Sequence, residues 1–141
     1  MFLKIARNLR FPAISKKTSA KLINTLSITF FMNIENVKIV VFVPLIHSDI
    51  VRKAIGDVNE GMIGNYSHCS FSSRGIGRFK PNEKANPHIG KANKLEEVEE
   101  EKIEVICPRN AAKKVINAIK KVHPYEEVAL DIYPLINESN L

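Results

Sequence analysis

Two stretches of this chain repeat one pattern: residues 37–58 read VKIVVFVPLIHSDIVRKAIGDV, and residues 101–122 read EKIEVICPRNAAKKVINAIKKV. Eight aligned positions hold the same residue in both copies. In the first copy they are Lys38, Ile39, Val41, Pro44, Val51, Ala54, Ile55 and Val58. An internal repeat of this kind indicates two copies of one structural unit.

Each copy predicts a strand, a proline and a helix. Residues 39–43 form an unbroken apolar run rich in β-branched residues, which is typical of a buried central strand. Pro44 has no N–H to donate to a sheet and is expected to end that strand. Apolar residues then recur at helical spacing in both copies. In the second copy, Asn110 is expected to cap the helix.

A further strand is predicted after each helix. Residues 69–79 follow the first helix and have a glycine-rich middle, which favours a bent or bulged strand. Residues 128–133 follow the second helix and alternate apolar and polar positions. The order βαβ–βαβ predicts an α+β fold, the ferredoxin-like plait, with a four-stranded antiparallel sheet and two helices on one face. The folded domain is expected over residues 36–136, with a long loop at 80–97 and a C-terminal tail at 137–141.

Length and composition agree with one globular domain. The chain has 141 residues, of which 45% are hydrophobic and 26% charged, so a wholly disordered chain is excluded. No apolar run is long enough for a membrane span. The net charge is +6, but residues 1–33 hold six basic residues and no acidic one. Because the remaining charge is balanced, nucleic acid is not an expected partner.

The basic segment 1–33 is expected to lie outside the fold. Its composition resembles a transit or other targeting segment, whereas a start at Met32 would make it untranslated leader sequence. A folded element is the third alternative. A start at Met32 implies a cytoplasmic protein, and a transit peptide implies a mitochondrial one.

The first candidate site follows the first helix. Its glycines at the helix exit indicate either a helix stop with a tight entry into the next strand, or a small-molecule pocket with backbone N–H donors. The candidate ligand-binding residues are Gly61, Gly64, Asn65, Tyr66 and Cys69.

The second candidate site follows the second helix and contains His123, Tyr125, Glu126 and Glu127. These residues either end the helix or supply acid, base and ligand chemistry. His123, Glu126 and Glu127 are candidate ligands of a divalent metal ion. In the plait, the two helices are expected to run side by side in the same direction. The two candidate sites should therefore converge at the C-terminal ends of the helices and form a pocket that favours a cation.

No catalytic motif is present: the chain lacks GxSxG, HExxH and a P-loop. An enzymatic function therefore has no motif to support it. Five ordered segments nevertheless resemble the inserted PII/CutA-like domain of the Nif-three-like family, which includes YqfO-type proteins and is also known as GTP cyclohydrolase type 1 homologues. The segments are residues 64–71, 75–81, 86–90, 100–104 and 123–127.

The resemblance implies a stand-alone PII/CutA-like domain that forms a homo-oligomer, with a trimer favoured, and that acts on a partner protein. It implies a non-enzymatic module that responds to a small molecule or a metal. The alternative is a metal-dependent hydrolase or cyclohydrolase-type enzyme. The family's His-rich metal-binding halves have no counterpart here, since the chain holds four histidines: His47, His68, His88 and His123. The ligand is not identified by the resemblance.

Overall fold

The computed structural model describes residues 34–59 and 63–141. Residues 34–141 form one compact unit, which is described below. The predictions for the basic segment 1–33, and the candidate ligand residue Gly61, lie outside the described residues.

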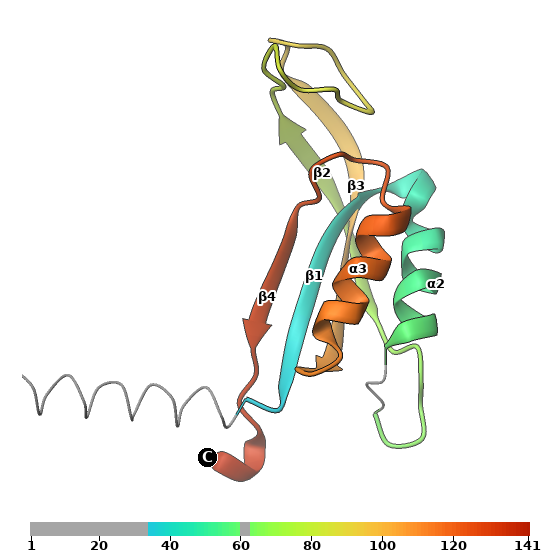
Figure 1. The fold of residues 1–141 in the computed structure, drawn as a ribbon, viewed down its shortest axis with the longest axis vertical. Helices are drawn as coiled ribbons and strands as arrows, with labels where there is room; N and C mark the ends of the chain where they lie inside the picture. The colour runs from blue at the N-terminus through green and yellow to red at the C-terminus, as the bar shows by residue number, and fades with distance from the viewer. Residues whose placement is uncertain (1–33, 60–62) are drawn as a thin grey trace, which may run out of the picture. The chain divides into compact units, whose positions relative to one another are not determined.

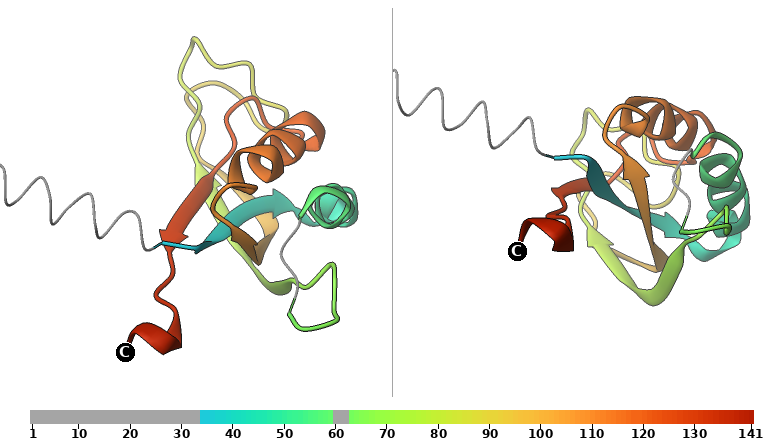
Figure 2. Two further views of the ribbon diagram at one scale, coloured as in Figure 1. Left: turned by 60° about the horizontal axis from the view of Figure 1, so that its bottom comes forward. Right: turned by 90° about the horizontal axis from the view of Figure 1, so that it is seen from below.

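The described residues form a four-stranded antiparallel sheet with two α-helices. The sheet order is β2-β3-β1-β4, and both helices cover the same face of the sheet (Figures 1 and 2). This arrangement confirms the predicted ferredoxin-like plait. The elements are β1 (Asn36–Pro44), the 3₁₀ turn η1 (Leu45–His47), α2 (Ser48–Val58), β2 (Phe71–Phe79), β3 (Glu96–Pro108), α3 (Ala112–Val122), β4 (Leu130–Pro134) and the 3₁₀ turn η2 (Glu138–Asn140).

The core lies between the sheet and the helices. Alternate residues of β1 and β3 point toward α2 and α3, whose apolar stripes close over them. The fully buried members are Ile39, Val41, Val43, Val51, Ile103, Cys107, Val115 and Ile119. Among the described residues, no helix is both long enough and apolar enough to cross a membrane.

The two helices run in opposite directions (Figure 1). Strands β1 and β3 are antiparallel neighbours at the centre of the sheet. Each helix returns along the strand that precedes it, so antiparallel strands lead into antiparallel helices. The expectation that both helices run in the same direction is therefore wrong.

Three local predictions meet different outcomes. Both Pro44 and Pro108 end their strands, as the repeat predicts. Strand β2 pairs with β3 residue by residue from Phe71 to Phe79, so the expected bulge is absent from this strand. Asn110 does not cap the second helix: α3 begins one residue later than that cap requires, its N-cap is Ala111, and no side chain caps it.

Candidate functional site

A groove of about 760 Å³ opens at the end of the sheet where β1 stops. Its walls come from β2, the start of β3, the loop between these strands and the segment that follows α3. Four of the segments that carry the family resemblance contribute to it, namely residues 75–81, 86–90, 100–104 and 123–127. Segments far apart in the sequence therefore meet at one place.

The floor of the groove lies on the sheet face opposite the helices. Lys102 of β3 pairs with Phe42 of β1 on one side and with Ser73 of β2 on the other. Paired residues project to the same face, and the next residue, Ile103, is buried in the helix-facing core. Phe42, Lys102 and Ser73 therefore form a row that faces away from the helices, and all three line the groove.

Two glycines of β2 have different roles beside the groove. A Cβ atom at Gly75 would meet nothing within 4 Å, so this position faces open space. A Cβ atom at Gly77 would overlap the carboxylate of Glu100. The absence of a side chain at Gly77 lets Glu100 lie across the strand, where it accepts a hydrogen bond from the Tyr125 hydroxyl at 3.1 Å.

We expect Gly77→Ala to displace Glu100 and to lower the free energy of unfolding by about 1 kcal/mol, the usual worth of one hydrogen bond. The matched control is Gly75→Ala, which adds the same methyl group to the same strand without a clash. It should leave stability unchanged or slightly raised, because alanine restricts the unfolded chain. Chemical denaturation of both variants measures the difference, and equal stability would contradict the assigned role of Gly77.

His123 is buried and fully hydrogen bonded. Its Nε2–H donates to the carbonyl of Phe42 at 2.9 Å, and its Nδ1 accepts from the backbone N–H of Tyr125 at 3.1 Å. Burial lowers the pKa of His123 below the ordinary value for histidine, although the Phe42 carbonyl partly opposes this effect. The side chain therefore joins the end of α3 to β1 as a neutral imidazole.

Tyr125 forms one side of the groove. Its ring contacts Phe79 edge to face with ring centres 5.8 Å apart, and it contacts the ring of His123 at 5.2 Å. Burial and the hydrogen bond to the Glu100 carboxylate both raise the pKa of Tyr125. Its hydroxyl therefore stays protonated and serves as a donor to Glu100.

The carboxylates and the cations of the groove differ in their partners. Glu100 accepts from Tyr125, and Glu126 accepts from the backbone N–H of Asn86 at 2.9 Å. Arg74 and Lys80 also line the groove, and within the described ranges 34–59 and 63–141 neither has an ion-pair partner. Glu127 also lines the groove, and in those same ranges none of Glu100, Glu126 and Glu127 has an ion-pair partner, so groups of both signs are available at this site.

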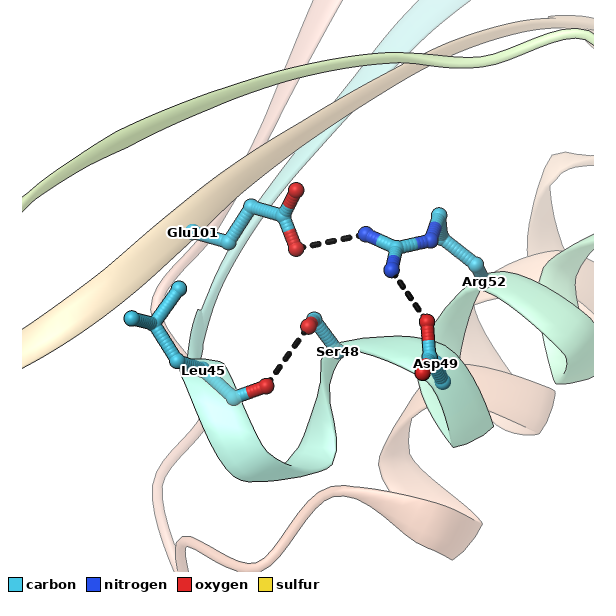
Figure 3. A network of polar contacts seen from close by, with 5 residues as sticks. All are labelled: Leu45, Ser48, Asp49, Arg52 and Glu101. Atoms are coloured by element: carbon cyan, nitrogen blue, oxygen red, sulfur yellow. Dashed lines mark hydrogen bonds and ion pairs between the residues drawn. The ribbon is translucent and has the colours of Figure 1, made fainter.

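An ion-pair network joins the start of α2 to Glu101 of β3 (Figure 3). The guanidinium of Arg52 donates to Glu101 and to Asp49, while the Ser48 hydroxyl donates to the carbonyl of Leu45 at 2.7 Å. Burial alone would raise the pKa of Glu101, but the nearby Ser48 hydroxyl dipole and the hydrogen bond and positive charge of Arg52 outweigh it and hold that pKa below its usual value. The network is structural, since none of its members lines the groove.

The first candidate segment lies at the other end of the sheet. Ile63 and Tyr66 exchange backbone hydrogen bonds around a tight turn, in which Gly64 has a φ of 59° and Asn65 is exposed. Cys69 lines a separate small cavity with residues of α2. Among the described residues, the segment thus forms a local turn between α2 and β2, while α2 itself already ends at Val58 with Asn59 as its C-cap.

The two candidate segments do not converge. The end of α2 contacts β3 at Ile106, whose carbonyl accepts from Asn59, whereas Tyr125 contacts β3 at Glu100. Six residues of strand separate these points, which corresponds to about 20 Å. The expectation of one shared, cation-favouring pocket is wrong, because antiparallel helices place their C-terminal ends at opposite ends of the sheet.

The candidate metal ligands are not assembled into a metal centre. No group of three His, Cys, Asp or Glu side chains able to hold a metal ion occurs in the part of the chain that the structure describes. Both ring nitrogens of His123 are occupied by backbone groups, and one carboxylate oxygen of Glu126 holds Asn86. His123 is thus a structural residue, while Tyr125, Glu126 and Glu127 line the groove.

Several groove residues were not among the sequence-based candidates. Phe42, Gly75 and Lys102 are examples, and Arg74 and Lys80 are the two cations described above. Residues 75–81 contain a GxG pattern, but this pattern by itself indicates only a strand that contains glycines and does not indicate a binding site. No sequence signal singles out Phe42. Lys102 lies in the resemblance segment 100–104, but strand pairing is what brings both residues to the groove.

Two curated relatives of the chain carry the same name. No protein-family model matches the chain. It is 56% identical over 101 residues to a "GTP cyclohydrolase 1 type 2 homolog" of Halalkalibacterium halodurans, which covers 72% of this chain and 27% of that protein. It is 52% identical over 98 residues to the Bacillus subtilis protein of the same name, covering 70% and 26%. The chain thus spans about a quarter of the length of these curated relatives.

Three solved structures share the fold of this chain. A Bacillus cereus "protein related to NIF3" matches with a TM-score of 0.64 and 53% identity over 73% of this chain and 26% of that one. The CutA protein of Archaeoglobus fulgidus matches with a TM-score of 0.53 at 14% identity, covering 72% and 85%. The B. subtilis GlnK protein matches with a TM-score of 0.50 at 13% identity, covering 72% and 82%. Over this CutA- and PII-like domain, the chain is homologous to the NIF3-related GTP cyclohydrolase 1 type 2 homologues.

Proposed function

We propose that this domain is a non-enzymatic binding module, and that the groove beside Gly75 holds a small organic molecule with an anionic group. The observation that carries the proposal is the groove itself, whose volume falls in the range of about 300–1,000 Å³ typical of ligand sites. A ligand there would contact the loop between β2 and β3. Its occupancy would therefore change the surface that this loop presents to a partner protein.

The chemistry of the lining supports an anionic ligand with a flat apolar part. Phe42, Phe79 and Tyr125 supply aromatic surface, and Gly75 leaves room for close approach to the backbone. Lys102 on the floor and Lys80 beside it supply positive charge, and Lys80 has no ion-pair partner among the described residues. Guanidinium and ammonium groups suit carboxylate and phosphate groups of a ligand.

The alternative, a metal-dependent hydrolase or cyclohydrolase-type enzyme, needs several His, Asp or Glu side chains that converge on one reacting centre. The carboxylates of Glu100 and Glu126 are instead held by donors of the protein. The groove therefore supports binding better than it supports hydrolysis.

Gly75→Leu tests the groove because a Cβ atom at this lining position meets nothing within 4 Å, and the longer side chain would occupy part of the groove. GTP serves as the first probe, since it combines a flat base with phosphates, and guanosine serves as the control without an anionic group. We expect GTP to raise the melting temperature of the wild-type protein and to add one ligand mass per chain in native mass spectra. Gly75→Leu should lose both effects at an unchanged melting temperature without ligand.

Two outcomes would count against the binding proposal. Equal GTP binding by the wild-type protein and Gly75→Leu would place the ligand outside the groove. Consumption of GTP, measured by chromatography of the nucleotide, would favour the enzymatic alternative. If guanosine bound as strongly as GTP, the proposal that the ligand carries an anionic group would be refuted. The proposal that the groove is the binding site would stand.

The same sheet face supports a homo-oligomer, which we propose to be a trimer. Ile106 and Tyr133 flank Lys38 in one row on the face opposite the helices, and they are 43% and 51% exposed. Phe71, 68% exposed, lies on the same face at the edge strand β2. Exposed apolar side chains beside open strand edges are typical of protein interfaces.

We expect Ile106→Lys to shift the protein toward monomer in light scattering at micromolar concentration, because a lysine would be buried in the proposed interface. The matched control is Ile50→Lys on α2, where the isoleucine is 52% exposed on the helix layer. The control should keep the wild-type mass. A wild-type monomer, or equal dissociation by both variants, would contradict the interface.

A further inference from the structure

The outer side of α3 carries only positive charge. The helix contains no aspartate or glutamate, and its exposed lysines are Lys113, Lys114, Lys120 and Lys121. At 3.6 residues per turn, these four positions fall within about 120° of the helix circumference. The buried residues of the helix lie on the opposite side. The four lysines therefore form one continuous surface, which we call the lysine face.

The companion helix α2 comes from the same sequence repeat but has a neutral outer side. Its two basic residues, Arg52 and Lys53, are each paired with an aspartate of the same helix. By contrast, three lysines of α3 have no ion-pair partner in the ranges 34–59 and 63–141, namely Lys113, Lys120 and Lys121. The two copies of the repeat thus share their buried positions and differ in their outer charge.

Helix stability does not account for the lysines at the start of α3. The first turn of a helix carries partial positive charge from its free N–H groups, so a cation is unfavourable there and a carboxylate is favourable. Yet Lys113 and Lys114 occupy this turn, which contains no acidic residue and no side-chain cap. Residues that oppose local stability without a structural benefit are typical of functional surfaces.

We infer that the lysine face binds an acidic α-helix of a partner protein. Lys113 and Lys120 are seven residues apart, as are Lys114 and Lys121, so each pair spans about 10.5 Å along the helix axis. A helix that lies alongside α3 and has glutamate or aspartate at seven-residue intervals presents carboxylates at the same spacing. Each lysine of a pair would then meet one carboxylate of the partner helix.

The extent of the lysine face favours a protein partner over nucleic acid or a membrane. Residues 34–141 contain 15 acidic and 21 − 6 = 15 basic residues, so the positive charge is not part of the broad basic surface that nucleic acid requires. The residue between the lysine pairs is the polar Asn117, so no apolar side chain there would enter a bilayer. The lysine face also lies on the helix layer, away from the sheet face proposed for the oligomer, and it does not depend on what the groove binds.

The test uses the full chain and a fluorescein-labelled helical peptide of about three heptads with two glutamates in each heptad. Fluorescence anisotropy measures binding at about 50 mM salt, where exposed charges are weakly screened. We expect the protein to bind this peptide and not a peptide with glutamine in place of glutamate. Lys113→Glu combined with Lys120→Glu should weaken binding about tenfold or more, because attraction becomes repulsion at two positions. Lys113→Glu alone should keep or raise the melting temperature, because a carboxylate suits the first turn.

Lys84→Glu combined with Lys91→Glu is the matched control. Both lysines are exposed in the loop between β2 and β3, and the net charge changes by the same amount. The control should bind the peptide like the wild-type protein. Three results would overturn the inference: no binding of the acidic peptide, equal loss in both double variants, or tighter binding of duplex DNA or phosphatidylserine vesicles than of the peptide. A lower mass of Lys113→Glu/Lys120→Glu in light scattering would also overturn it, because a second copy of the chain would then occupy the lysine face.

Discussion

Ile103→Ala is expected to lower the free energy of unfolding by about 3 kcal/mol, a typical cost for a large-to-small change in a core. Ile103 is fully buried at the centre of β3, where it pairs with Val41 on one side and Ser72 on the other. The truncation removes buried apolar surface and leaves a cavity beneath the helices. A domain of this size is stabilised by about 5–15 kcal/mol, so the loss is a large fraction of the total.

Urea denaturation at one fixed protein concentration measures this effect, because association would make stability concentration-dependent. The matched control is Ile46→Ala, which removes the same atoms from a side chain that is 85% exposed. It should change stability by less than about 0.5 kcal/mol. A comparable loss in both variants would show that Ile103 is not a core residue.

His123→Ala is expected to destabilise the domain by about 2–3 kcal/mol. The change removes two hydrogen bonds and leaves the Phe42 carbonyl and the Tyr125 N–H unpaired in a buried place. His123→Gln offers both a donor and an acceptor and should restore part of the loss. Failure of His123→Ala to destabilise would contradict the structural role, as would equal destabilisation by both variants.

The same residue makes stability depend on pH. Its folded pKa is lowered, so between that pKa and the unfolded value of about 6.5 the unfolded chain binds more protons than the folded one. The contribution of His123 is therefore fully present above pH 6.5 and declines as the pH falls through that window. Two neighbours act on the ring: Glu100 favours its protonation and His47 opposes it. His123→Gln should flatten this part of the stability curve, and an unchanged curve would be the contradicting result.

The family resemblance and the fold can be predicted from individual segments of sequence. The groove depends on how those segments are arranged in space. The segments around Gly77 and His123 indicate a site only as short motifs, and each also suits a purely structural role. In the structure, His123 has the structural role, because it joins α3 to β1. Its neighbour Tyr125 lines the groove. The turn at Gly64 lies at the far end of α2 and takes no part in the groove.

The sequence by itself determined the two βαβ units, because the alternation of strands, the helical spacing and the stops at Pro44 and Pro108 are local properties of the chain. Only the tertiary structure decided which segments meet. The antiparallel pairing of β1 with β3 turns the helices in opposite directions and separates the two candidate segments. The same pairing aligns Phe42, Lys102 and Ser73 into the floor of the groove. Strand register in this sheet depends on contacts between residues 17 to 97 positions apart, and no local pattern of residues specifies such contacts.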